Sequence, residues 1–332
     1  MAIEIPTKQN SEEPEFLRDS IDSPSPIESS TDEVNTEENA AITSINQDFD
    51  EEIEPSMHYT GESKKILDPM RVKVEIADAR TPIVVLFGPK TSGKTMMLVR
   101  LTRWLKKNGL SVMPIRTFRP ADDDYKKMCD SFNDMVDSNE AAKGTNAIDF
   151  MLLKVSQNGR PICQILEAPG EHYYNIERPS QSFPPYIHKI ISELKNKKIY
   201  VILTEGDWRN QETQDSRDAY VQKINDLRRL SDIKDKFIVV LNKVDLTEFT
   251  LSKGLYNKPQ ARRAVKNLYP RIFEIFENQH PITRFFRPSY ATFMAFQSGE
   301  FSQTADGETF IYTPGADAYA KELWSQIISA CN

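Results

Sequence analysis

The sequence has few of the residues that build disulfide scaffolds and zinc modules. Its 332 residues include three cysteines and four histidines, which are scattered and form no Cys-x-x-Cys pair. A chain of this length buries enough apolar surface to fold without covalent cross-links or a structural metal. We therefore expect a protein of a reducing compartment that has neither a disulfide framework nor a zinc module.

Long apolar runs are also missing. No stretch reaches the roughly 18 residues of a membrane span, and residues 1–6 lack the basic flank and apolar core of a secretory signal. Residue 2 is Ala and Cys331 is next to last, so neither end fits a lipidation motif. We expect a cytoplasmic protein with no integral membrane segment. The net charge of −7 argues against general nucleic-acid binding, and we predict no specific nucleic-acid partner.

Acidic charge is concentrated at one end of the chain. Residues 1–60 hold 16 acidic and two basic side chains, a net charge of −14, whereas the rest carries +7. Few apolar residues and a high charge of one sign predict a disordered tail over about 1–65. Such a tail is a solvating segment or, alternatively, a tether or autoinhibitory arm that touches the basic body.

From residue 66 onward, strand patterns alternate with helix patterns. The apolar run 82–87 is typical of a strand buried on both faces. The runs 148–155 and 161–166 flank Asn158-Gly159, which predicts an antiparallel hairpin. Further strands are expected at 72–76, 198–203, 237–241 and 284–289, helices near 97–107, 121–137, 186–194, 215–230, 259–278 and 320–331, and a surface hairpin within 291–313. Pro270 should kink or divide the helical stretch that contains it.

This alternation predicts one α/β domain over 66–332, a three-layer sandwich with helices on both faces of a mostly parallel sheet. The hairpin at 148–167 would supply one antiparallel strand. Residues 110–145, between the first helix and this hairpin, form the predicted insertion.

The strongest motif directly follows the first buried strand. It fits the pattern G-x-x-x-x-G-K-[ST] between a strand and a helix, where backbone amides can wrap around phosphates. Its residues are Gly88, Pro89, Lys90, Thr91, Ser92, Gly93, Lys94 and Thr95. Lys94 would reach the β- and γ-phosphates, and the Thr95 hydroxyl would hold Mg²⁺.

A second motif, Asn242-Lys243-Val244-Asp245, follows the strand at 237–241. Guanine presents two adjacent donors that the carboxylate of Asp245 can accept together, whereas adenine would leave this carboxylate unpaired. We expect Asn242 to contact the other edge of the base and to join this loop to the phosphate loop. The aliphatic stem of Lys243 would cover the face of the base.

With these two motifs, the chain resembles the P-loop GTPases of the translation-factor and Ras-like class over about residues 80–332. The resemblance implies GTP or GDP as ligand, Mg²⁺ as cofactor, and two switch segments that respond to the γ-phosphate. It does not place the chain in a subfamily.

The predicted second switch departs from this class. Where the class has Asp-x-x-Gly, the chain has Glu167-Ala168-Pro169-Gly170. Gly170 would offer its amide to the γ-phosphate, and Glu167 is the candidate for a water-mediated Mg²⁺ contact. Glu171 and His172 follow, where the class often carries a residue that orients the attacking water. A carboxylate at this place predicts slow hydrolysis, with Glu171 and His172 as catalytic candidates.

Other predicted site residues lie farther along the chain. Thr145 is the candidate for the first-switch threonine that closes over Mg²⁺. Ser289 and Tyr290 are the candidates for the loop that reaches the guanine oxygen. Arg116 and Arg119 could act as an arginine finger in cis, although salt bridges with their neighbours are the simpler interpretation.

The sequence favours a slow GTPase switch that acts on a protein partner. Two alternatives stay open: a GTP-binding interaction module with little hydrolysis, and an ATP-using P-loop enzyme, which would give Asn242–Asp245 no role. The predicted partner surface spans 145–150 and 170–186. Its aromatic residues, which could dock a partner or pack inside the domain, are Tyr173, Tyr174, Phe183 and Tyr186.

Overall fold

The computed structural model describes residues 68–120, 123–137, 150–206, 213–279, 281–286, 289–303 and 310–332. The chain divides into two units, Met1–Glu62 and Ser63–Asn332, and every described residue belongs to the second. The predicted acidic tail, 1–65, therefore lies outside the described residues.

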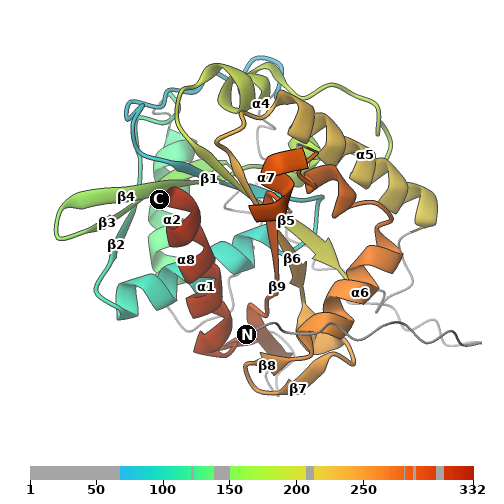
Figure 1. The fold of residues 1–332 in the computed structure, drawn as a ribbon. Coiled ribbons are helices and arrows are strands. Elements are labelled where there is room, and N and C mark those ends of the chain that lie inside the picture. Colours follow the sequence, from blue (N-terminus) through green and yellow to red (C-terminus); the bar gives the residue numbers. More distant parts are fainter. Residues whose placement is uncertain are drawn as a thin grey trace, which may run out of the picture. The chain divides into compact units, whose positions relative to one another are not determined.

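A seven-stranded sheet is the centre of the fold (Figure 1), and its strand order is β2-β3-β4-β1-β5-β6-β9. Its strands are β1 Ile83–Phe87, β2 Ser111–Pro114, β3 Met151–Gln157, β4 Arg160–Glu167, β5 Lys198–Glu205, β6 Lys236–Asn242 and β9 Ala291–Ala295. Neighbours from β4 to β9 pair in parallel, and β3 pairs antiparallel with both β2 and β4. Within the described part of the sheet, β3 alone runs against the others, which confirms the predicted α/β class with one antiparallel strand.

Helices cover both faces of this sheet (Figure 1), with α1, α2 and α8 on one side and α4, α5 and α6 on the other. The helices are α1 Lys94–Lys107, α2 Asp123–Asp137, α3 Gly170–Tyr173, α4 Pro185–His188, α5 Gln214–Leu230, α6 Lys258–Leu268, α7 Pro281–Phe286 and α8 Asp317–Cys331. A π-helix, Lys189–Glu193, continues α4, and 3-10 turns span Val244–Leu246 and Glu274–Phe276. Two small hairpins pair β7 Thr250–Ser252 with β8 Leu255–Tyr256, and β10 Gly299–Gln303 with β11 Phe310–Pro314.

Two left-handed residues make the tight turn between β3 and β4. Asn158 and Gly159 have φ angles of 49° and 75°, and the flanking residues Gln157 and Arg160 pair directly. Positive φ at both central positions defines the hairpin turn that suits the twist of the strands. At the end of α1, Gly109 (φ 78°) lets Leu110 N donate to Leu105 O, a Schellman-type helix stop.

Two predicted strands are wrong. Residues 72–76 form no strand, although their apolar side chains pack on the core. Within the described residues, their one backbone hydrogen bond to a residue far away in the sequence runs from Glu75 N to Phe118 O (2.8 Å). The predicted strand 284–289 is replaced by α7, and β9 begins only at Ala291. Ile282, Phe285 and Phe286 follow helical spacing, and Pro281 suits the first turn of a helix.

Two other boundaries are refined. The helix predicted over 259–278 ends at Leu268, just before Pro270, and resumes only as a 3-10 turn at Glu274–Phe276. The predicted insertion, residues 110–145, contains β2, which forms an edge of the main sheet. Between β2 and β3 the described residues include α2, whose apolar face packs against the core through Tyr125, Cys129 and Phe132.

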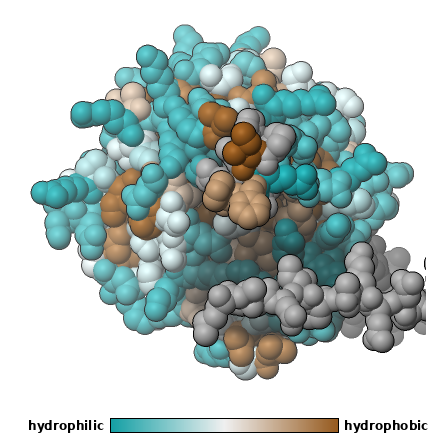
Figure 2. Space-filling model, in the orientation of Figure 1, coloured by the Kyte–Doolittle hydropathy of each residue, from teal (hydrophilic) through white to brown (hydrophobic). Residues whose placement is uncertain are grey.

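The core encloses β1 completely, since each of its five residues is at most 2% exposed. The visible face in Figure 2 is mostly hydrophilic, with a hydrophobic group over α7, where Ile282, Phe285 and Phe286 are exposed. No helix in the described ranges is long and apolar enough to span a bilayer.

Candidate functional site

The phosphate loop, residues 88–95, connects the carboxyl end of β1 to the first turn of α1. A β-carbon on Gly88 would lie 2.6 Å from Ser92 Oγ. Gly93 has φ 81°, and a β-carbon there would lie 2.5 Å from Asn242 Nδ2. Close packing therefore favours glycine at position 88, and the left-handed backbone together with close packing requires it at position 93.

Lys94 lies inside the loop that it terminates. The side chain is buried, and Nζ donates to the carbonyls of Gly88 (3.2 Å) and Pro89 (2.9 Å). These bonds hold the ammonium group at the mouth of the loop, with the first-turn amides of α1 beside it. Such an arrangement of positive charge and backbone donors suits an anion of the phosphate class.

Thr95 and Glu167 bring two oxygen ligands together beside Lys94. Thr95 Oγ1 donates to Glu167 Oε1 over 3.0 Å, and Glu167, the last residue of β4, is 2% exposed. A hydroxyl and a carboxylate fit Mg²⁺, which keeps several waters and needs few protein ligands. The described ranges contain no group of three His, Cys, Asp or Glu side chains that could form a complete metal cage. Thr145 lies outside the described residues.

Gly170 and Glu171 contact the phosphate loop directly. A β-carbon on Gly170 would lie 2.3 Å from Lys90 N and 2.4 Å from Pro89 C, so the backbone of this residue packs on the Pro89–Lys90 peptide. The Glu171 carboxylate pairs with Lys90 Nζ at 3.1 Å. Burial raises the pKa of Glu171, but hydrogen bonds from its own amide and from Lys90, together with the charges of Lys90 and Lys94, lower the pKa overall.

His172 contacts a group of aromatic side chains. Its Nδ1 lies 2.6 Å from the Tyr186 hydroxyl, and its ring packs edge-on against Phe150 and Tyr186. This contact fixes the imidazole at the start of the 170–186 segment. Its role as a group that orients water stays a prediction.

The second motif is joined to the phosphate loop by two hydrogen bonds. Asn242 Nδ2 donates to Ser92 O (2.8 Å), as the sequence predicts, and Lys243 Nζ donates to Thr91 O (3.1 Å). Lys243 also pairs with Glu205, the last residue of β5, at 2.9 Å, and its backbone is left-handed with φ 53°. The ends of β1, β5 and β6 thus form one surface at the carboxyl edge of the sheet.

Asp245 is half-buried in the 3-10 turn after β6. Burial raises the pKa of this carboxyl, and the negative charge of Glu300 on β10 adds to the rise, while its own backbone amide and Lys243 oppose it. The 3-10 turn is attached to the loop after β9, because Val244 N donates to Phe296 O (3.2 Å).

The prediction for Ser289 and Tyr290 is wrong. Both residues precede β9, and β9 runs parallel to β6, so they lie at the amino edge of the sheet, opposite the phosphate loop. The segment that reaches the carboxyl edge beside Asp245 is 296–298, directly after β9. The error follows from placing the last strand several residues too early.

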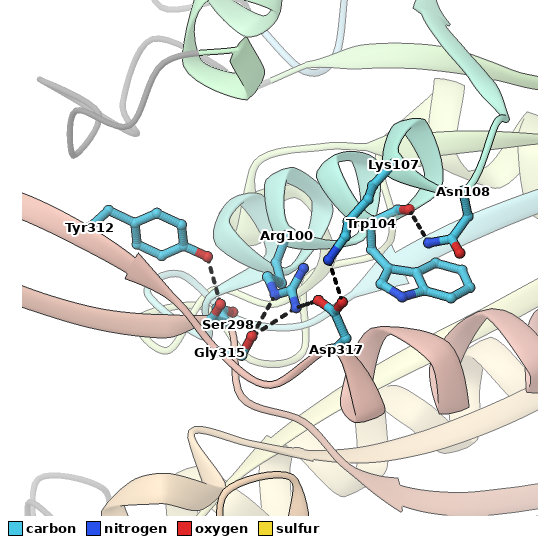
Figure 3. Close-up of polar contacts among 8 residues, drawn as sticks. All are labelled: Arg100, Trp104, Lys107, Asn108, Ser298, Tyr312, Gly315 and Asp317. Carbon is cyan, nitrogen blue, oxygen red and sulfur yellow. Dashed lines mark hydrogen bonds and ion pairs between the residues drawn. The ribbon is translucent and has the colours of Figure 1, made fainter.

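A cluster around Arg100 supports this base-side loop (Figure 3). Arg100, on α1 and 4% exposed in its side chain, donates to Gly315 O (2.7 Å) and pairs with Asp317 (2.6 Å) at the start of α8. Lys107 pairs with the other oxygen of Asp317 at 2.9 Å. Tyr312, on β11, donates to Ser298 O. The helix that begins in the phosphate loop therefore also holds the hairpin and the loop after β9.

The structure shows the positions of several other residues for which the sequence left two roles open. The four aromatic side chains proposed as docking candidates are each at most 8% exposed and pack in the core: Tyr173, Tyr174, Phe183 and Tyr186. Arg116 pairs with Asp130 at 2.6 Å, as the simpler interpretation predicted. Arg119 is buried instead against the rings of Tyr125 and Phe150, a position from which no arginine finger extends.

No family model and no curated protein matches the sequence. Among solved structures, Roco2 of Methanosarcina barkeri bound to GDP is 12% identical over 78% of this chain and 51% of that chain, with a TM-score of 0.32. The putative nucleolar GTP-binding protein 1 of Plasmodium falciparum is 9% identical over 77% and 90%, with a TM-score of 0.35. The GTPase-like domain of Ski7 from S. cerevisiae, bound to GTP, is 12% identical over 76% and 50%, with a TM-score of 0.35.

These neighbours are GTPase-like, GTP-binding or bound to GDP. This chain spans only about half the length of the Roco2 and Ski7 chains.

Proposed function

We propose that this chain is a guanine-nucleotide-binding protein that hydrolyses GTP slowly and acts in the cytoplasm as a switch toward a protein partner. The observation that supports it most is the pair of bonds that joins Asn242 and Lys243 to the phosphate loop. An enzyme that recognises only the phosphates of its nucleotide does not need this connection. A guanine-specific site needs the residues that contact the base to lie at a fixed distance from those that contact the phosphates.

The phosphates would lie on the amides of the phosphate loop, with Lys94 at the β- and γ-positions. Thr95 and Glu167 would hold Mg²⁺, which neutralises charge on the phosphate oxygens when bound. Lys243 would cover the base, and Asp245 would accept its two adjacent donors. The loop 296–298 takes the place beside the base that Ser289 and Tyr290 were expected to fill.

Slow hydrolysis follows from the residues beside the γ-phosphate position. Glu171 carries a carboxylate whose pKa is lowered, so it is negatively charged at neutral pH and would repel the γ-phosphate next to which it would have to orient the attacking water. His172 is engaged with Tyr186. The interaction module with little hydrolysis is the second candidate function, and the ion pair between Glu171 and Lys90 favours it.

A partner would contact the segments 145–150 and 170–186, which flank the predicted γ-phosphate position. Since the aromatic side chains of 170–186 are buried, its outward residues, such as Ile176 at 63% exposure, would form the contact. Isolating bound proteins with the GTP-loaded and GDP-loaded forms would test this. A partner that binds both forms equally would contradict the switch.

Affinity measurements with GTP, GDP and ATP test the nucleotide assignment. We expect GTP and GDP to bind at least a hundredfold more tightly than ATP, because adenine leaves the half-buried Asp245 carboxylate without donors. Equal binding of ATP would overturn the guanine assignment. A single-turnover assay then separates the two functions: slow release of phosphate supports the switch, and none on any timescale supports the module.

A further inference from the structure

We infer that Glu171 competes with the γ-phosphate of a bound nucleotide. The Glu171 carboxylate pairs with Lys90 of the phosphate loop and thereby makes the site favour a nucleoside diphosphate over a triphosphate. This inference rests on the proposed guanine-nucleotide function and adds a specificity-determining residue to it. Three observations carry it: the packing of Gly170, the ion pair of Glu171, and the charges that surround its carboxylate.

The packing of Gly170 closes the space beside the loop. A γ-phosphate that received the Gly170 amide would have to lie between this residue and the Pro89–Lys90 peptide. The two backbones are instead in contact, since even one added methyl carbon would lie 2.3 Å from Lys90 N. A triphosphate would therefore have to displace the segment 167–171, whereas the β-phosphate of a diphosphate, cradled deeper in the loop, would not.

The ion pair places an anionic oxygen on this side of the loop. Glu171 Oε1 lies 3.1 Å from Lys90 Nζ, and Lys94 is close enough for its charge to stabilise the same carboxylate. A γ-phosphate would need the same two ammonium groups. The Glu171 carboxylate thus supplies the negative charge near Lys90 and Lys94 that a γ-phosphate would otherwise supply.

The expected strength of the pair suits a competitor rather than a permanent block. Lys90 and Glu171 are 73% and 43% exposed in their side chains, and exposed ion pairs are weak. GTP can displace such a contact. The displaced carboxylate remains near the γ-phosphate, however, and repels it. Its effect should therefore appear as a lower ratio of GTP affinity to GDP affinity.

The test compares GTP and GDP affinities of the full chain and of Glu171→Gln, which keeps the shape of the side chain and removes its charge. We expect the GTP affinity to rise about fivefold, the upper end for an exposed ion pair, while the GDP affinity changes less than about twofold. Glu177→Gln is the matched control, because Glu177 is exposed in the same segment, so this variant loses the same charge without touching the loop. It should leave both affinities unchanged.

A second variant tests whether Lys90 is the lysine for which Glu171 and the γ-phosphate compete. In the Glu171→Gln background, Lys90→Gln should remove most of the gain in GTP affinity, since Lys90 would by then serve the γ-phosphate. An unchanged or lower GTP-to-GDP affinity ratio in Glu171→Gln would overturn the inference, as would an equal gain in the control. A wild-type chain that binds neither nucleotide would instead overturn the proposed function.

Discussion

The phosphate side and the base side of the candidate site are built in different ways. On the phosphate side, Lys94 bonds to carbonyls five and six residues before it, so one contiguous motif makes its own geometry. On the base side, Arg100 bonds to Gly315 and Asp317, which are 215 and 217 residues away. One half of the site is thus local and the other depends on tertiary packing, and α1 belongs to both.

This comparison predicts that Lys94→Ala removes function without removing the fold. A ligand at a hundred times its Kd stabilises a protein by about 2.7 kcal/mol. We expect this stabilisation by GDP to disappear in the variant, because the buried ammonium group is lost from the loop. Thermal unfolding with and without GDP measures it. Lys106→Ala, on the same helix, should keep the stabilisation, and an unchanged response of Lys94→Ala would contradict the site assignment.

Arg100→Met tests the opposite property, a loss of stability on the base side. The variant leaves Gly315 O without its donor and removes the buried partner of Asp317, so we expect unfolding free energy to fall by about 2 kcal/mol. Denaturant titration without nucleotide provides the measurement. Lys107→Met removes the exposed partner of the same Asp317 and should cost less than about 0.5 kcal/mol. Equal losses would show that burial of Arg100 is unimportant.

A smaller effect concerns pH on the base side. Only the ionised Asp245 accepts both guanine donors, and the pKa of this carboxyl is raised by burial and by Glu300. Guanine-nucleotide affinity should therefore fall as the pH falls through this raised pKa, starting at a higher pH than for an ordinary aspartate. In Glu300→Gln the fall should move to lower pH, because a negative charge that raises the pKa of Asp245 is removed.

The pH profile of GDP affinity measures this shift, with Glu248→Gln as the control for loss of an exposed charge nearby. A profile of Glu300→Gln that moves to higher pH, or a control that moves as far, would contradict the assignment of Glu300 as a neighbour of the base-binding carboxylate.

The sequence predicted those parts of the molecule whose determinants are contiguous. The buried run of β1, the turn at Asn158-Gly159 and the phosphate loop each depend on short-range rules, and each is found where expected. The last strand was misplaced, because β9 is defined by its pairing with β6 rather than by its own composition. Because of this error, the sequence prediction places Ser289 and Tyr290 at the carboxyl edge of the sheet, whereas they lie at its amino edge.

The role of Arg100 could not be predicted, since nothing near it in the chain indicates a partner more than 200 residues away. The aromatic residues of 170–186 were ambiguous for a related reason. Their spacing fits both a surface and a core, and only packing against β1, for example Phe87 against Tyr173 at 4.9 Å, decides for the core.

The contacts of Arg103 join the helix of the phosphate loop to the end of α2. Arg103, on α1, donates to the carbonyls of Met135 and Val136, which belong to the last turn of α2. The last carbonyls of a helix have no partner within that helix, and a nearby cation stabilises them. The last turn of α2 contains no basic residue of its own. One helix therefore supplies the C-terminal cap of another, so a change in α1 that moved Arg103 would destabilise α2 as well.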